Sequence, residues 1–426
     1  MKPATLLIIG AGDRGTVFSN YALGHRQETE VVAVAEPREL FRNRLGDAWK
    51  LPADRRFADW KQIVAGPKVA DAVVVTCPDA LHAEVAIAFA NKGYHMLLEK
   101  PMANHLDECK RIVEAVERAD IVFAVCHVLR YTVYTSKLKE IIDSGAIGEV
   151  VTVQHIEPVE FWHQAHSYVR GNWRNEATSS PMLLAKSCHD TDWLRHIIGK
   201  PCRKISSFGS LFHFRKEQRP AGATDRCLDC PLESTCPYSA WRIYLQRTLD
   251  GQTGWPMDVI TGEVTVENVT RALREGPYGR CVFACDNDVV DNQVVNMLFE
   301  GERTANFLMT AFSYGTKRQT HIFGTGRQTR IFGTRGELQH HGEAIHLHDF
   351  LTDKGHTIKA TRDPSHVDTH GGGDHVLMGA FLHGVRTGDR SRILSGPRET
   401  LETHAMCFAA EIARRENRVV DMTEVL

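Results

Sequence analysis

The sequence lacks several features that would narrow its function at once. It has no apolar run of about 18 residues, so we expect no membrane-spanning helix. Its first apolar stretch, residues 5–9, is too short for a signal peptide and runs directly into glycines. The formal net charge is only -2, and like charges form no long block. We therefore expect neither nucleic acid nor an anionic membrane as a partner.

Cysteine pairs of the kind that stabilise secreted domains are also lacking. The 11 cysteines are odd in number, and most stand singly in apolar or helical surroundings. Mainly free thiols and a cytoplasmic location are therefore expected. With 426 residues, 42% of them hydrophobic, the chain can bury a large core and should form two domains.

Residues 1–125 alternate between apolar strand patterns and helical patterns. This order requires crossover connections and predicts a doubly wound parallel sheet, a Rossmann domain. The expected strands are 5–9, 31–35, 72–76, 93–98 and 121–125. The expected helices are 16–23, 38–49, 79–92 and 104–118.

Residues 126–426 follow a different pattern, which predicts an α+β domain with a large, mostly antiparallel open sheet. Half-buried strands are expected at 149–156, 289–299 and 304–312 and near Ile322, Ile331 and Leu338, with helices at 181–198, 374–387 and 398–414. A polar segment at about 216–262 is typical of an insertion. The exposed sheet face favours a homo-oligomer, a dimer or a tetramer.

The first strand runs into Gly10-Ala11-Gly12-Asp13-Arg14-Gly15, and the second ends at Glu36. Glycines in this pattern allow a tight turn and a close approach to a pyrophosphate at a helix N-terminus. A carboxylate about twenty residues later can hold a ribose 2′-hydroxyl, so we expect NAD as the cofactor. Arg38 could instead pair with the 2′-phosphate of NADP, and a glycine-rich turn in an ordinary α/β domain is the simpler alternative.

Other polar residues follow the expected parallel strands. Because ligands bind at the carboxyl ends of such strands, Thr76, Glu99 and His127 are expected close to the glycine turn. Lys100 follows the fourth strand and precedes a proline. A partly desolvated lysine there can orient a substrate hydroxyl and help move its proton. Simple pairing of Lys100 with Glu99 is the alternative.

Together these motifs resemble the Gfo/Idh/MocA family of nicotinamide-dependent sugar and cyclitol oxidoreductases. The resemblance rests on the glycine turn, Thr76-Cys77-Pro78-Asp79 with His82, Glu99-Lys100-Pro101, and His189 with Asp192. It covers nearly the whole chain except the insertion, and the Glu-Lys-Pro motif is its most specific part. The expected cofactor-binding residues are Gly10, Gly12, Asp13, Arg14, Gly15, Glu36, Thr76, Pro78, His82, Glu99, Lys100 and His127.

The resemblance implies that Lys100 and a histidine, here His189, act on the substrate. Histidine titrates near neutrality and can take a hydroxyl proton, although His189 could also be an ordinary helix histidine. The family normally has an aspartate four residues before this histidine, whereas this sequence has Ala185. Asp192 is predicted to be catalytic in its place, and Asp190 is the alternative.

Residues 161–174 are rich in aromatic and hydrogen-bonding groups, which favours sugar binding over a loop packed on the sheet edge. A second stretch, from His366 to Asp374, contains three glycines and is either part of the substrate site or a turn. The residues predicted to bind substrate are His166, Tyr168, Arg170, Trp173, Lys186, Asp190 and His370.

Cys227, Cys230 and Cys236 have the spacing of metal ligands. They predict a structural zinc site, with His213 as the preferred fourth ligand before Cys202 and Cys285. Free thiols or a thiol–disulfide pair are the alternatives.

The resulting hypothesis is an NAD-dependent dehydrogenase that transfers hydride between a nicotinamide and a sugar, sugar derivative or cyclitol hydroxyl. Two alternatives remain. The first is an NAD-dependent glycosidase that uses transient oxidation and elimination, and the second is a non-catalytic NAD or sugar sensor.

Overall fold

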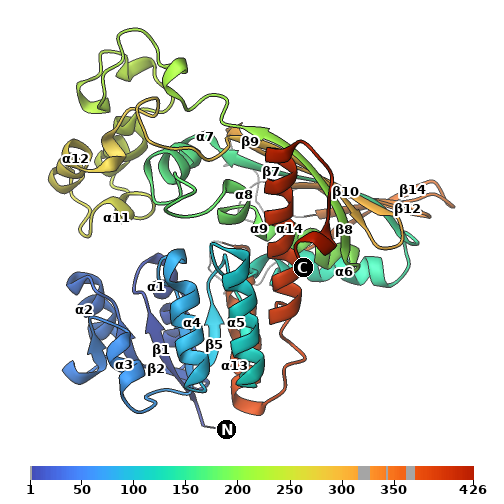
Figure 1. Cartoon of the computed structure of the whole chain (residues 1–426), viewed down its shortest axis with the longest axis horizontal. Helices are drawn as coiled ribbons and strands as arrows, with labels where there is room; N and C mark the ends of the chain where they lie inside the picture. The colour runs from blue at the N-terminus through green and yellow to red at the C-terminus, as the bar shows by residue number, and fades with distance from the viewer. Residues whose placement is uncertain (1, 315–326, 342–343, 361–369) are drawn as a thin grey trace.

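The computed structural model describes residues 2–314, 327–341, 344–360 and 370–426. Two sheets organise these residues (Figure 1). The first has six strands in the order β3-β2-β1-β4-β5-β6, and the second has nine in the order β14-β13-β12-β11-β7-β10-β9-β8-β15. No helix in the described part of the chain is long and apolar enough to span a bilayer.

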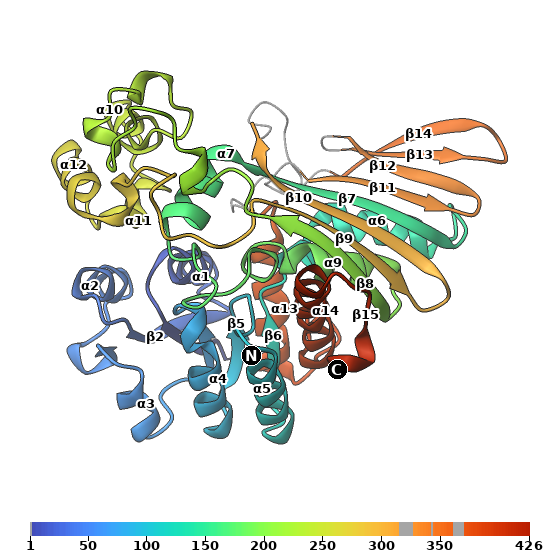
Figure 2. The ribbon, with the colours of Figure 1, turned by 45° about the horizontal axis from the view of Figure 1, so that its top comes forward.

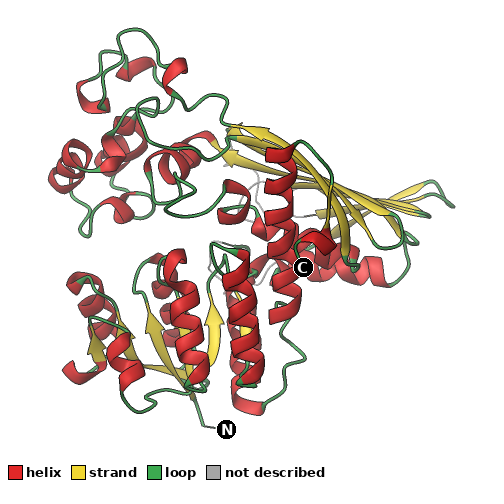
Figure 3. Ribbon diagram, viewed as in Figure 1, coloured by secondary structure: helices red, strands yellow, loops and turns green. Residues whose placement is uncertain are grey.

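The six-stranded sheet is parallel throughout, which confirms the predicted doubly wound domain. Its strands are β1 (Ala4–Ile9), β2 (Thr29–Ala35), β3 (Arg56–Phe57), β4 (Ala72–Val75), β5 (His95–Leu98) and β6 (Phe123–Val125). The helices that follow them are α1 (Asp13–Gly24), α2 (Glu39–Ala48), α3 (Lys61–Ala65), α4 (His82–Asn91) and α5 (Leu106–Arg118). Buried apolar residues on both faces of the strands explain why helices cover both sides (Figure 3).

The nine-stranded sheet is mixed and mostly antiparallel, as the sequence predicted, with one parallel pair between β7 and β10. Its strands are β7 (Val150–Glu160), β8 (Cys202–Ser210), β9 (Asn292–Phe299), β10 (Arg303–Ser313), β11 (Gln328–Gly333), β12 (Gly336–His341), β13 (Ala344–Asp349), β14 (Lys354–Lys359) and β15 (Val420–Asp421). The expected strand near Ile322 lies outside the described residues.

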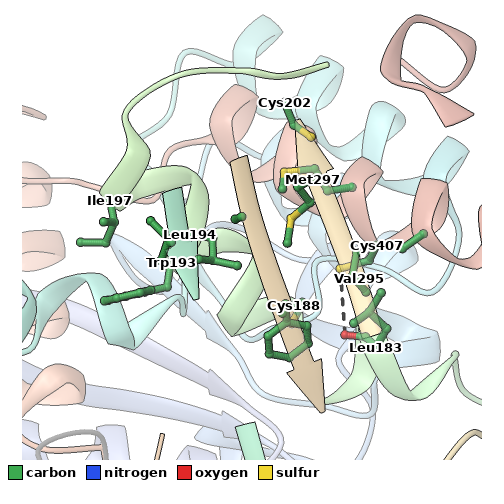
Figure 4. Packing of buried hydrophobic residues seen from close by; sticks show 14 of the residues in the cluster. Leu183, Cys188, Trp193, Leu194, Ile197, Cys202, Val295, Met297 and Cys407 are labelled. Carbon is green, nitrogen blue, oxygen red and sulfur yellow. Dashed lines mark hydrogen bonds between the residues drawn. The ribbon is translucent and has the colours of Figure 1, made fainter. Parts of the chain in front are cut away.

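Helices pack on one face of this sheet (Figure 2). They are α6 (Val133–Asp143), α8 (Met182–Ala185), α9 (Cys188–Ile198) and α14 (Pro397–Glu416). Figure 4 shows the resulting core, in which Trp193 of α9, Met297 of β9 and Cys407 of α14 are labelled. All three are nearly or fully buried. This core fixes α8 and α9 against the sheet.

Two further parts of the chain join the sheets. Helix α13 (Gly373–Thr387) follows β14 of the second sheet in sequence but packs on the first sheet, where Leu377 and Phe381 join the core around β1. The segment between β8 and β9 carries α10 (Gln246–Leu249), α11 (Met257–Ile260) and α12 (Val266–Glu275). A nitrogen of Arg44 on α2 donates a 2.9 Å hydrogen bond to the carbonyl of Gly262 in this segment. The inserted segment therefore reaches back to the parallel sheet.

Candidate cofactor and substrate site

The glycine turn between β1 and α1 requires glycine at two positions. Gly10 has φ +90°, and a Cβ there would lie 2.5 Å from the carbonyl oxygen of Thr76. A Cβ on Gly15 would lie 2.0 Å from the carbonyl oxygen of Gly10. The Thr76 hydroxyl also donates to the Gly10 carbonyl, at 2.7 Å. The turn therefore holds bare backbone against the N-terminus of α1, the geometry that accepts a diphosphate.

Glu36 closes the turn from the end of β2. Its Oε2 accepts a 2.9 Å hydrogen bond from the Ala11 N–H, and its Oε1 accepts one of 2.7 Å from Nε of Arg38. Burial raises the pKa of Glu36, but the hydrogen bonds from Arg38 and Ala11 outweigh it and leave that pKa below its usual value. The buried carboxylate is therefore ionised beside the place where a ribose 2′-hydroxyl would lie, and it disfavours a 2′-phosphate. These residues fit NAD.

A chain of charged groups connects the turn to the Glu-Lys-Pro motif. Nε of Arg14 lies 2.6 Å from Oε1 of Glu99, and its Nη2 pairs with Asp374. Asp374 also lies 2.7 Å from Nδ1 of His370. The structure thus brings three of the predicted site residues, Arg14, Glu99 and His370, into one network. In this network the carboxylate of Glu99 pairs with an arginine.

Lys100 does not use Glu99 as a partner for its ammonium group. The backbone N–H of Lys100 donates to Glu99, whereas Nζ donates a 2.9 Å hydrogen bond to the carbonyl oxygen of Ala185. Lys100 is half-buried and joins the end of β5 to the end of α8. This geometry differs from the alternative in which the ammonium simply pairs with Glu99.

His82 supports the same loops. Its ring nitrogens lie 2.8 Å from the Pro101 carbonyl and 3.0 Å from the Cys77 carbonyl, and the residue is fully buried. These contacts give His82 a positioning role between the loops after β4 and β5. Pro78 lies in the first of these loops and is exposed.

Two of the predicted histidines, His189 on α9 and His127 after β6, lie close together near Lys100. Their ring centroids are 5.8 Å apart. Burial first, and then the charge of Lys100, lowers the pKa of His189 well below its usual value. The ring is therefore neutral near pH 7. Its Nδ1 is buried and has no hydrogen-bond partner among the described residues.

Asp192 lies next to His127, with its Oδ2 3.7 Å from Nδ1 of that ring. Its carboxylate forms a bidentate pair with Arg130, at 2.6 and 2.7 Å. It also accepts from the hydroxyl of Thr403, at 3.1 Å. Asp192 is fully buried and therefore fixes Arg130 and the C-terminal helix; the structure does not place it against Lys100.

A buried ionic network that the sequence analysis missed lies behind Lys186. Its Nζ is 3.3 Å from Glu157 on β7, and the other oxygen of Glu157 is 3.0 Å from Nε of Arg327. Arg327 also contacts Asp190, whose Oδ1 lies 3.0 Å from Nε2 of His155. Glu157, Arg327 and His155 occupy strand patterns that give no local sign of this role.

The aromatic stretch divides into two parts. Trp173 donates through Nε1 to Asp79, at 2.8 Å, and Tyr168 packs beside His163 near the lysines. His166 instead lies 2.9 Å from the hydroxyl of Tyr244 in the insertion.

Arg170 belongs to the second part, because Nε donates to the Arg280 carbonyl at 2.7 Å and Nη2 to the Tyr238 carbonyl at 2.8 Å. The structure thus uses His166 and Arg170 to anchor the insertion. His366 lies outside the described residues.

No zinc site is shown at the predicted ligands. Among residues 2–314, 327–341, 344–360 and 370–426, no group of three or more His, Cys, Asp or Glu is arranged to hold a metal ion. The thiol of Cys227 lies 3.4 Å from a guanidinium nitrogen of Arg170, whose charge would repel a metal cation. His213 packs among aromatic rings, and Cys230 and Cys236 remain half-buried free thiols.

The parallel sheet, its glycine turn and the second α/β unit define an oxidoreductase with a dinucleotide-binding domain. The model of the oxidoreductase family's NAD-binding Rossmann fold matches residues 4–127, and that of its C-terminal alpha/beta domain matches residues 139–422. The chain therefore belongs to the Gfo/Idh/MocA oxidoreductase family.

Two of the curated relatives are named dehydrogenases, one of a cyclitol and one of a sugar derivative. Myo-inositol 2-dehydrogenase of Thermotoga maritima is 26% identical over 206 residues, 48% of this chain and 58% of that protein. Levoglucosan dehydrogenase of Pseudarthrobacter phenanthrenivorans is 30% identical over 154 residues, 35% of this chain and 39% of that protein. The chain thus matches less than two thirds of the length of either relative.

Solved structures match over nearly the full length and show the fold. Levoglucosan dehydrogenase in complex with NADH and levoglucosan has a TM-score of 0.69 at 18% identity, covering 99% of both chains. An oxidoreductase from Agrobacterium radiobacter in complex with NAD+, L-tartaric acid and magnesium has a TM-score of 0.70 at 15% identity, also covering 99% of both chains.

Proposed function

We propose that this protein is an NAD-dependent dehydrogenase that acts on a hydroxyl group of a sugar, sugar derivative or cyclitol. The observation that carries the proposal is the position of Lys100. Its ammonium extends from the Glu-Lys-Pro motif, next to the cofactor turn, to the carbonyl of Ala185 just before His189. The named dehydrogenases among the relatives support the same substrate class.

The glycine turn and Glu36 would bind the diphosphate and ribose of NAD, and bound NAD supplies the hydride acceptor. Lys100 would donate a hydrogen bond to the substrate hydroxyl and orient it. His189, whose Nδ1 has no hydrogen-bond partner among the described residues, would take the hydroxyl proton. The carboxylate of Asp192, which pairs with Arg130, lies 3.7 Å from Nδ1 of the neighbouring His127.

The test is NADH formation at 340 nm with a panel of polyols, aldoses and cyclitols, and NADH consumption with keto-sugars. Absorbance that changes with one substrate class, and not in Lys100→Met, supports the proposal. If NAD binds but no substrate in the panel changes the absorbance, the result favours the sensor.

The carbonyl of Ala185 favours a second candidate, an NAD-dependent glycosidase. This carbonyl accepts the hydrogen bond from the Lys100 ammonium at a position where the family normally has a carboxylate. The proton-transfer groups therefore differ from those of an ordinary dehydrogenase. Release of nitrophenol from a glycoside panel without net NADH accumulation would identify this activity.

The proposal extends to self-association of the nine-stranded sheet. Large apolar side chains are exposed on this sheet, among them Phe208 at 63%, Val151 at 46% and Phe312 at 44%. Apolar exposure of this kind on an open sheet is typical of a protein interface. Light scattering should give a dimer or tetramer mass, and Phe208→Asp should lower it.

A further inference from the structure

One tryptophan of the inserted segment, Trp255, packs against the aromatic stretch that follows β7. Its ring centroid is 4.9 Å from that of Trp162 and 4.9 Å from that of His163, both in the short helix α7 (Phe161–His163). The ring of His166 is 5.3 Å away. Trp255 is nevertheless 40% exposed. Three rings therefore hold Trp255 in position and leave part of its surface open to a ligand.

This exposure is not explained by a role in anchoring the insertion. The buried core of the insertion includes Trp162 and Met257 but not Trp255. Met257, two residues further along the chain, is almost fully buried and fixes the same part of the insertion. A large aromatic side chain that the core does not require is therefore presented at its surface.

His163 connects Trp255 to the lysines of the site. Burial lowers the pKa of His163 well below its usual value, and the nearby charges of Lys186 and Lys100 lower it further. The ring is therefore neutral near pH 7, with one donor and one acceptor nitrogen. Neither nitrogen has a hydrogen-bond partner among the described residues, and neither is buried as Nδ1 of His189 is. The half-buried His163 thus has both nitrogens accessible near the lysines.

The same row of rings continues to the cofactor domain. The centroid of Tyr168 lies 5.9 Å from that of His163, and the centroid of Trp173 lies 6.2 Å from that of Tyr168. Nε1 of Trp173 donates a 2.8 Å hydrogen bond to Asp79, which follows β4. The row therefore runs from the loop after β4, past the substrate side of the site, to Trp255 of the insertion.

The chain after Trp255 leads back to the cofactor turn. Burial raises the pKa of Asp258, and the neighbouring charge of Asp13 at that turn raises it further. The carbonyl of Gly262 then accepts the hydrogen bond from Arg44 on α2. Figure 1 shows α11, which contains Asp258, facing α1 and α2. Residues 255–262 thus border the site from its substrate side to its cofactor side.

The groups around the open surface of Trp255 fit a sugar ring. Pyranoses and cyclitols carry a rigid patch of C–H groups that packs on a flat aromatic face, and their hydroxyls bond to an imidazole or an ammonium group. An acyclic polyol has the same hydroxyls on a flexible chain. It loses conformational entropy when it presents an apolar face, so it binds less tightly.

We propose that the substrate is bound as a ring, a pyranose or a cyclitol, whose apolar face packs on Trp255 while a hydroxyl that is not oxidised bonds to His163. This inference rests on the proposed dehydrogenase function and narrows its substrate class. It makes the insertion a specificity element, because Trp255 discriminates cyclic substrates from acyclic polyols of similar composition. Trp255 and His163 bind the substrate, and Lys100 and His189 remain the groups that act on the reacting hydroxyl.

The experiment compares ligands that carry similar hydroxyls with and without a ring. Glucose against sorbitol, galactose against galactitol and myo-inositol against mannitol are titrated calorimetrically into protein saturated with NADH, and KM and kcat are measured with NAD. We expect the cyclic member of at least one pair to bind about tenfold or more tightly than its acyclic partner. Equal affinities in all three pairs overturn the inference.

Trp255→Ala should raise KM for the preferred cyclic ligand by about tenfold and change kcat by less than about threefold, because it removes binding that is the same before and during the reaction. Trp255→Phe keeps a flat ring and should retain most of the affinity. His163→Phe keeps the ring but loses both nitrogens, so it should also raise KM. Leu249→Ala, which truncates a 54% exposed side chain at the end of α10, is the control and should leave both constants unchanged.

Trp255→Ala also removes a neighbour of three rings and could loosen the insertion. Trp255→Leu keeps apolar volume without a flat face and is the second test, with thermal unfolding and NADH affinity as measures of integrity. Wild-type KM in both variants overturns the inference even if NADH forms, and the dehydrogenase proposal then stands. If cyclic ligands bind selectively through Trp255 but no NADH forms, the sugar-ring subsite stands and the dehydrogenase proposal fails.

Discussion

The ammonium of Lys100 donates a 2.9 Å hydrogen bond to the carbonyl of Ala185, although one residue follows a strand of the parallel sheet and the other lies on a helix packed on the nine-stranded sheet. Lys100 lies near the start of the loop after β5, and Ala185 ends α8, which packs on the nine-stranded sheet. The contact therefore joins the cofactor side of the site to the substrate side. It also explains why the lysine keeps a fixed position without an ion-pair partner among the described residues.

Replacing Lys100 by methionine should lower kcat by about 100-fold or more, because the hydroxyl loses both its orienting donor and its proton relay. Methionine keeps the length and apolar stem of lysine. NAD affinity, measured by fluorescence titration, should change little, because the turn and Glu36 bind the other end of the cofactor. Lys92→Met, at an exposed lysine after α4, is the matched control. Wild-type kcat in Lys100→Met would contradict the proposed mechanism.

Cofactor preference should depend on Glu36 and Arg38 acting as a pair. Glu36→Ala removes the acceptor for a ribose 2′-hydroxyl. It also frees the guanidinium of Arg38, whose Nε lies 2.7 Å from Oε1 of Glu36 in the wild-type protein. NAD affinity should fall by about tenfold, which corresponds to a loss of about 1.4 kcal/mol of binding free energy. Affinity for NADP should rise in the same variant.

In Glu36→Ala/Arg38→Ala the gain for NADP should disappear, because the partner for the 2′-phosphate is gone. Dissociation constants of NADH and NADPH from fluorescence titration give both numbers. An unchanged ratio of the two constants would show that Glu36 does not contact the ribose.

The cofactor side was predictable from sequence because its residues form a compact motif. Gly10, Gly12 and Gly15 lie within six positions between a strand and a helix, and Glu36 directly follows an apolar strand. The spacing of these residues records the motif, although the contact that requires glycine at position 10 is to Thr76, a residue distant in the chain. The parallel sheet followed from the same alternation of strands and helices.

The substrate side was less predictable because its causes are distant. Glu157 and Arg327 are 170 positions apart and meet only because β7 pairs with β11. His166 and Arg170 resemble sugar-binding residues, but both form hydrogen bonds with residues of the insertion. Strand β14 is exposed along most of its length, so it gives no alternation of buried and exposed residues.

Breaking the buried network at Arg327 should destabilise the fold strongly. Arg327→Met leaves Glu157 and Asp190 buried without their shared cation, and the expected loss of unfolding free energy is about 3–5 kcal/mol. The matched control is Arg330→Met. That arginine is 43% exposed and pairs with Glu337, so its removal should cost about 1 kcal/mol or less. Urea unfolding at neutral pH measures both, and similar losses in the two variants would argue against a structural role for the network.

Acid should destabilise the protein through His127. Burial lowers the pKa of His127 to about 4, below the ordinary value of 6.5, so the unfolded chain binds a proton that the folded chain does not. Above pH 6.5 His127 therefore leaves the free energy of unfolding unchanged. As the pH falls from 6.5 toward 4, protonation of the unfolded chain lowers that free energy progressively. Between pH 7 and pH 5 the loss from this one residue should be about 2 kcal/mol.

His127→Gln cannot take up that proton, so its unfolding free energy should depend less steeply on pH over this interval, whatever its absolute stability. Replacing His356, which is exposed on β14, is the control and should leave the slope as in the wild type. Urea unfolding of the cofactor-free protein at four pH values gives the slopes. Parallel curves for wild type and His127→Gln would mean that His127 is charged, or reached by solvent, in the folded protein.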